Sequence, residues 1–116
     1  MSKRIYIAAP YDGPTAEDIQ SNVGRVELAA VRLIGHRFIV FAPHLSHYIA
    51  KKAENIRQPI SRDYWLEWGL RWLELCDAMV VLGLSPGVNQ EIHFAEQHHI
   101  PVYFGLEELY RAYLEG

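Results

Sequence analysis

Cysteine, excess charge and long apolar runs are all scarce in this sequence, and each shortage excludes a class of protein. The single cysteine, Cys76, cannot form a disulfide within the chain or supply a metal-binding or redox cysteine pair. A net charge of −3 with scattered Lys and Arg lacks the basic stripe with which proteins bind nucleic-acid polymers. The first apolar run is too short for a signal peptide or a membrane-spanning helix. We therefore expect a protein of a reducing compartment, by default the cytoplasm, with no membrane partner.

Apolar residues make up half of the 116 positions, which is enough for the core of one domain, residues 1–116. Short apolar runs alternate with amphipathic stretches along this domain, a pattern typical of doubly wound α/β proteins. We expect a Rossmann-like parallel sheet of four or five strands, in the order 2-1-3-4, with helices on both faces. The runs predict strands at 5–9, 38–42, 78–82 and 101–104, and the periodic stretches predict helices at 15–35, 61–75, 90–98 and 106–114.

The segment 43–59 has the weakest pattern, and we expect a flexible flap there, with a possible short helix near 45–53. The helix predicted after it carries Trp65, Trp68 and Trp72 on one stripe and leucines on another. One sheet can cover only one of these apolar sides. The tryptophan stripe therefore either packs under the flap or forms the interface of a homodimer or higher homo-oligomer.

Ligands of open α/β sheets bind beyond the carboxyl ends of the strands, where the winding changes direction. For the order 2-1-3-4 this point lies between the first and third strands, so the turns that follow them, 9–13 and 83–89, are expected to meet there. Both turns are rich in Gly and Pro, and the second leads directly into a helix whose free amides can bind an anion. The candidate substrate-binding residues in and beside these turns are Ala8, Pro10, Asp12, Gly13, His44, Ser85, Gly87 and Asn89.

Glu91 lies in the first turn of the helix predicted after the second loop, where the helix dipole favours an ionised carboxylate. A charged carboxylate at the ligand edge is a credible nucleophile, and the alternative is that it only complements the dipole. Tyr6, in the middle of the first strand, is a candidate to donate its hydroxyl to Glu91, although a strand tyrosine is more often core packing. The paired histidines at 44/47 and 98/99 lack further ligands at a familiar spacing, so neither a metal nor another cofactor is expected.

Several segments, taken in order, resemble the nucleoside 2-deoxyribosyltransferase superfamily. They are residues 5–11 (IYIAAPY), 76–78 (CDA) before an apolar strand, and 85–91 (SPGVNQE), followed by Ala95 and residues 100–102 (IPV). The resemblance spans nearly the whole chain. The sequence is similar in particular to small bacterial and phage members and to the 2'-deoxynucleoside 5'-monophosphate N-hydrolases.

The resemblance implies that Glu91 is a nucleophile that captures the sugar, that Tyr6 orients it, and that Ser85 matches a phosphate-binding serine. It also implies an aspartate that assists the departing base at the position where this chain has Gly69. Asp12 would repel a phosphate, and Arg57 or Arg62 could offset its charge. The expected function is cleavage or transfer at the N-glycosidic bond of a (deoxy)nucleoside or its 5'-monophosphate. The alternative, suggested by Gly69, is a non-catalytic nucleotide-binding or sensing module on the same fold.

Overall fold

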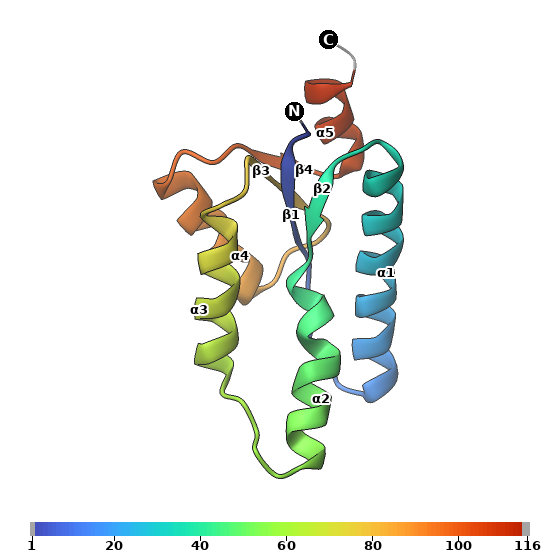
Figure 1. Ribbon diagram of the computed structural model, residues 1–116, viewed down its shortest axis with the longest axis vertical. Coiled ribbons are helices and arrows are strands. Elements are labelled where there is room, and N and C mark those ends of the chain that lie inside the picture. The colour runs from blue at the N-terminus through green and yellow to red at the C-terminus, as the bar shows by residue number, and fades with distance from the viewer. Residues whose placement is uncertain (1, 115–116) are drawn as a thin grey trace.

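One parallel sheet of four strands organises the protein, as seen in a computed structural model that describes residues 2–114 (Figure 1). The strands are β1 (Arg4–Ala8), β2 (Ile39–Phe41), β3 (Ala78–Val81) and β4 (Val102–Phe104). Their order is β2-β1-β3-β4, and every neighbouring pair is parallel. The predicted doubly wound sheet with the order 2-1-3-4 is therefore confirmed.

Helices cover both faces of this sheet, which explains why its central strands are apolar at consecutive positions. They are α1 (Ala16–Gly35), α3 (Arg62–Leu73), α4 (Pro86–Gln97) and α5 (Leu106–Tyr113). The remaining helix, α2 (His47–Asn55), lies beyond the end of β2 (Figure 1). Side chains alternate between the faces of a strand. Ile5 and Ile7 of β1 pack with buried residues of α1 and α5, whereas Tyr6 and Ala8 pack with buried residues of α3 and α4. Tyr6 is thereby directed toward the face that α3 and α4 cover.

The segment between β2 and α3 is helical over most of its length, and it contains the short helix expected near 45–53. A 3-10 helix, η1 (Pro43–Ser46), runs directly into α2, and the two pack together. Figure 1 shows the connection from α2 to α3 at the end of the molecule farthest from the two termini. The polar residues that suggested a loop lie on the exposed side of α2, while its Ala53 is buried.

The fourth helix begins at Pro86, four residues before the predicted start, because local capping outweighs the loop-like composition of this segment. Ser85 is the N-cap, and its side-chain oxygen accepts a hydrogen bond of 3.2 Å from the Val88 amide. Proline is favoured at the first helical position since no amide is needed there. Glu91 therefore lies in the second turn of α4, and the expectation that it occupies the first turn is wrong.

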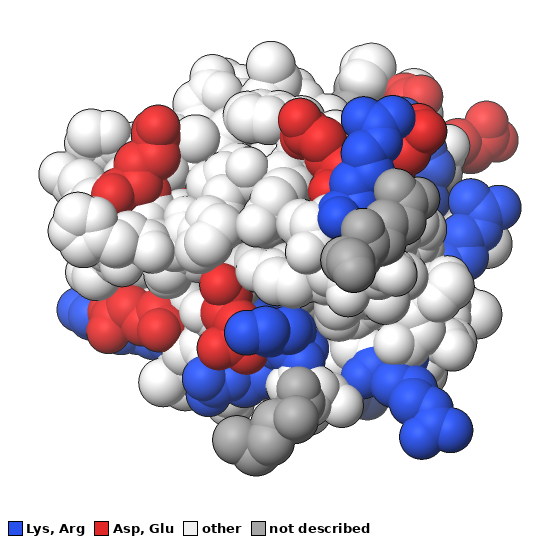
Figure 2. All heavy atoms as spheres, turned by 90° about the horizontal axis from the view of Figure 1, so that it is seen from above, with Lys and Arg blue, Asp and Glu red and all other residues white. Residues whose placement is uncertain are grey.

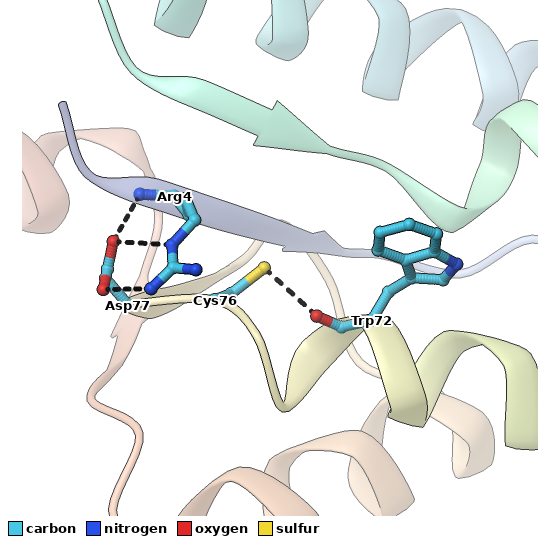
Figure 3. Close-up of polar contacts among 4 residues, drawn as sticks. All are labelled: Arg4, Trp72, Cys76 and Asp77. Atoms are coloured by element: carbon cyan, nitrogen blue, oxygen red, sulfur yellow. Dashed lines mark hydrogen bonds and ion pairs between the residues drawn. The ribbon is translucent and has the colours of Figure 1, made fainter.

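Arg4 and Asp77 join the starts of β1 and β3, at the amino edge of the sheet (Figure 3). Asp77 accepts hydrogen bonds from the Arg4 backbone amide at 2.7 Å and from its side-chain Nη2 at 3.2 Å. The bonds from Arg4 hold the pKa of Asp77 below its usual range. The neighbouring Cys76 thiol contacts the Trp72 carbonyl oxygen, and burial raises the pKa of Cys76 to about 11. These motif residues therefore stabilise the sheet at the edge opposite the predicted site.

None of the helices within residues 2–114 is both long and apolar enough to cross a membrane.

Candidate active site

The turns after β1 and β3 meet at the carboxyl edge of the sheet, as predicted for this strand order. The amide of Leu82 donates a 2.9 Å hydrogen bond to the carbonyl oxygen of Ala8. A Cβ atom added at Gly83 would lie only 3.1 Å from Pro10 Cδ, so glycine permits the close approach of the two turns. Ala8 itself is fully buried and its carbonyl oxygen already accepts the bond from Leu82, so the structure does not expose this predicted residue to a ligand.

Tyr6 and Glu91, which we call the Tyr6/Glu91 pair, contact each other in this region. The Tyr6 ring is fully buried in the middle of β1, and its hydroxyl donates a hydrogen bond to Oε2 of Glu91 from α4. Phe41 of β2 stacks on the Tyr6 ring with centroids 5.7 Å apart, which fixes the direction of the hydroxyl. Two residues 85 positions apart in the sequence, both predicted to be at the site, are thus brought together.

The protonation of the pair follows from its burial. Burial raises the pKa of Glu91 to about 7, and the hydrogen bond from Tyr6 opposes part of this shift. Burial also raises the pKa of Tyr6 well above its usual range, and the negative charge of Glu91 raises it further. Tyr6 therefore keeps its proton and acts as the donor, while Glu91 exchanges a proton near neutral pH. This is the opposite of the sequence argument, in which the helix dipole kept the carboxylate ionised.

Gly69 of α3 lies directly against the Tyr6/Glu91 pair. A Cβ atom added at Gly69 would be 2.8 Å from the Tyr6 hydroxyl oxygen, closer than side-chain carbons normally approach other atoms. The helix backbone at this position is therefore packed against the hydroxyl that holds Glu91. The position at which the sequence resemblance implies an acid has no room for one while Tyr6 keeps this orientation.

His44 is buried and forms a hydrogen bond to the turn after β1. The ring is only 5% exposed, and its Nε2 donates to the carbonyl oxygen of Pro10 at 3.1 Å, because a carbonyl can only accept. Burial lowers the pKa of His44, against the opposing effect of this bond. The Nδ1 atom is buried without a hydrogen-bond partner among the described residues. The structure thus places His44 at the predicted edge, but as a support for Pro10 rather than as an exposed contact.

Other contacts at this turn involve Tyr11, His47 and Asn22, which were not among the candidate site residues, and the predicted residues Asp12 and Arg62. Tyr11 forms a 2.7 Å hydrogen bond between its hydroxyl and Nδ1 of His47, and Asn22 of α1 donates to the Tyr11 carbonyl oxygen at 3.0 Å. No spacing in the sequence could have identified Asn22, since it lies among the polar positions of an ordinary amphipathic helix. Asp12 forms an ion pair of 3.5 Å with Arg62 at the start of α3, and both side chains are exposed. Arg62 therefore offsets the charge of Asp12 as expected.

The beginning of α4 presents Ser85, Gly87 and Asn89 near the end of β3, while Gly13 lies in the turn after β1. Ser85 uses its oxygen as the helix cap, which leaves its hydroxyl proton available to a ligand. Gly13 and Gly87 are partly exposed, and Asn89 is exposed. A helix N-terminus with a serine cap is suited to an anion such as phosphate.

An apolar cavity of about 560 Å³ lies between α2 and α3, on the side of the tryptophan stripe. Trp65 and Trp68 line it, whereas Trp72 is 45% exposed and stacks on Phe41 with centroids 5.2 Å apart. Of the predicted stripe, Trp65 and Trp68 therefore line the cavity, while Trp72 covers the ring of Phe41. The remaining lining residues are Ile49, Pro59, Ile60, Ser61 and Tyr64.

A second cavity, of about 370 Å³, opens at the amino edge of the sheet, away from Glu91, and includes Lys3, Phe38 and Tyr113.

Figure 2 shows the face that carries the termini, where acidic and basic side chains are interspersed and form no continuous basic stripe. Among residues 2–114, no group of three or more His, Cys, Asp or Glu side chains is arranged to hold a metal ion.

Residues 3–105 match the model of a protein family described as a domain of unknown function (DUF7768). No curated protein matches the chain. The matched span contains all four strands together with Tyr6, Gly69 and Glu91. The match describes no chemistry, and the geometry of these residues is what bears on function.

Proposed function

We propose that this chain, which belongs to the DUF7768 family, cleaves or transfers the N-glycosidic bond of a (deoxy)nucleoside or nucleoside 5'-monophosphate. The observation that carries the proposal is the Tyr6/Glu91 pair, a half-buried carboxylate held by a buried phenol where the turns after β1 and β3 meet. This is the edge at which doubly wound sheets bind ligands. The resemblance of the sequence to the nucleoside 2-deoxyribosyltransferase superfamily supports the same chemistry.

Glu91 acts as the nucleophile in this proposal. The hydrogen bond from Tyr6 occupies Oε2, so Oε1 is the oxygen that attacks the anomeric carbon and forms a glycosyl ester. Positive charge builds on the sugar as the bond to the base breaks, and a carboxylate in a water-poor pocket stabilises that charge strongly. Water or a second base then resolves the ester and frees Glu91. Because only the ionised carboxylate attacks, the rate should rise with pH up to about 7.

A 5'-phosphate would be held at the beginning of α4. The Ser85 hydroxyl and the Gly87 amide supply donors, since Pro86 has no amide hydrogen and the Val88 and Asn89 amides are bonded to Ser85. Arg62 neutralises Asp12 on the turn after β1. In this proposal the pocket is shaped by Pro10, Gly13, Gly87 and Asn89. His44 holds Pro10 in place through its hydrogen bond to the Pro10 carbonyl oxygen.

Self-association through α3, the helix that carries Trp65, Trp68 and Trp72, is also part of the proposal. Trp65 and Trp68 line an apolar cavity that the single chain leaves open, and Trp72 is partly exposed beside it. Sedimentation velocity should show a homodimer or higher homo-oligomer, and Trp65→Arg should shift it to the monomer. A wild-type protein that sediments as a monomer at all concentrations would contradict the assembly without affecting the chemistry.

Trapping of the covalent intermediate is the direct test of the function. Wild-type protein is mixed with a panel of nucleosides, deoxynucleosides and their 5'-monophosphates, quenched in acid, and examined by intact-mass spectrometry and chromatography. We expect free base in solution, and a protein mass increased by one sugar or sugar phosphate, localised to the peptide that contains Glu91. Absence of base release across the panel would overturn the proposed chemistry.

The second candidate is a nucleotide-binding module without turnover. Gly69 favours it, because this position supplies no side chain to protonate the departing base. A general acid commonly raises the reaction rate by about 10²–10⁴-fold. Thermal-shift screening with the same panel separates the two functions. Stabilisation by a nucleotide that is recovered intact would select the binding module.

A further inference from the structure

Glycine is an unfavourable residue in the middle of a helix, and at Gly69 the backbone conformation does not require it. Gly69 is buried within α3, and its φ is not in the left-handed region. Such a glycine lowers the stability of a helix relative to alanine. What distinguishes the position is space, because the Tyr6 hydroxyl oxygen lies 2.8 Å from the point where a Cβ atom would be.

We infer that Gly69 is a positioning residue that reserves this space for the Tyr6 hydroxyl, and that the chain consequently acts on nucleosides whose bases are acidic enough to leave without a donated proton. The inference rests on the proposed function for its second half only. A side chain at position 69 would displace the hydroxyl and release Oε2 of Glu91. Keeping the nucleophile oriented thus excludes an acid from this part of α3.

No other carboxyl group among residues 2–114 is buried at the Tyr6/Glu91 pair or bonded to it. The remaining Asp and Glu side chains of residues 2–114 are exposed, apart from Asp77, which binds Arg4 at the opposite edge of the sheet. On α3 itself, Glu67 is paired with Arg71 at 3.0 Å. Tyr6 cannot serve either, since its proton is held by Glu91.

The chemical consequence concerns the departing base. Oε1 of Glu91 forms a bond to the anomeric carbon, the bond from that carbon to the base nitrogen breaks, and its electron pair leaves with the base. The base departs as an anion and takes a proton from water. Without a donated proton, the rate depends steeply on the acidity of the base, approaching about tenfold per unit of its pKa when charge development is complete.

A double-mutant cycle tests the positioning role without any need for turnover. Gly69→Ala, Tyr6→Phe and the double variant are compared in thermal unfolding and in the titration of Glu91, followed by carboxyl-carbon NMR. Gly69→Ala should lower the Tm and shift the Glu91 titration in the wild-type background. In the Tyr6→Phe background the hydroxyl is gone, so the same substitution should no longer lower the Tm and should leave the titration unchanged.

Gly24 supplies the matched control, because it is a helical glycine of α1 with no atom within 4 Å of an added Cβ. Gly24→Ala should raise the Tm equally in both backgrounds. If Gly69→Ala is tolerated in the wild-type background, or is equally damaging with Phe at position 6, the positioning role is wrong.

A leaving-group series tests the substrate class. The probes are the 2'-deoxynucleosides and 5'-monophosphates of 5-fluorouracil, uracil and thymine, in falling order of base acidity, with hypoxanthine and adenine as the purine pair. In single-turnover measurements kcat/KM should fall along each series. A flat series would overturn this substrate class while the proposed function stands. Failure to release any base would overturn both, and the double-mutant cycle would still report on Gly69.

Discussion

Glu91→Gln should abolish base release, with a loss of at least about 10³-fold in kcat, because removing a catalytic nucleophile commonly costs that much or more. Glutamine keeps the shape of the side chain and can still accept the hydrogen bond from Tyr6, so ligand binding should be largely preserved. The amide oxygen is too weak a nucleophile to form the glycosyl ester. Single-turnover release of base, followed by chromatography, measures the loss.

Glu96→Gln is the matched control for this experiment, since Glu96 is an exposed residue of the same helix. It should leave the rate unchanged. Equal rates for wild type and Glu91→Gln would remove the nucleophile from the mechanism. Equal loss in both variants would indicate damage to α4 rather than to the chemistry.

Much of the fold could be predicted from the sequence because its signals are local. The apolar runs of β1 and β3 are buried on both faces, which predicted a parallel sheet, and the turns beyond them gave the ligand edge. Tyr6 and Glu91 could be paired because strand alternation and sheet order place both at that edge. The close packing of Gly69 on the Tyr6 hydroxyl could not be predicted from the sequence, because it depends on how α3 is shifted and rotated against the sheet.

The differences between the predictions and the structure have two physical origins, one in tertiary packing and one in local capping. Residues 43–59 were interpreted mainly as a flap because of their charged side chains, which did not reveal that Ala53 and His44 are buried under neighbouring elements. The start of α4 was placed too late because Pro86 and Gly87 are typical of turns, whereas Ser85 makes them the first residues of a helix. That error then produced the incorrect argument that the helix dipole ionises Glu91.

Burial, rather than the dipole, sets the behaviour of Glu91, and this links its function to a cost in stability. A carboxyl group with a pKa of about 7 in the folded protein, instead of its ordinary 4.5, resists ionisation in the folded state. Below pH 4.5 both folded and unfolded chains are protonated, and there is no penalty. Between 4.5 and about 7 unfolding releases a proton, so the free energy of unfolding falls as the pH rises.

Glu91→Gln should therefore be more stable than the wild type above neutral pH, although it is inactive. The penalty removed is at most about 3 kcal/mol, the free-energy equivalent of the shift from 4.5 to about 7. Urea unfolding at about pH 4 and about pH 8 measures it: the two proteins should differ little at the lower pH, where neutral Glu and Gln are alike, and most at the higher. Glu96→Gln should show no such dependence. A wild type that is as stable as Glu91→Gln at the higher pH would mean that Glu91 ionises freely, and the nucleophile would then need no help from Tyr6 or from burial.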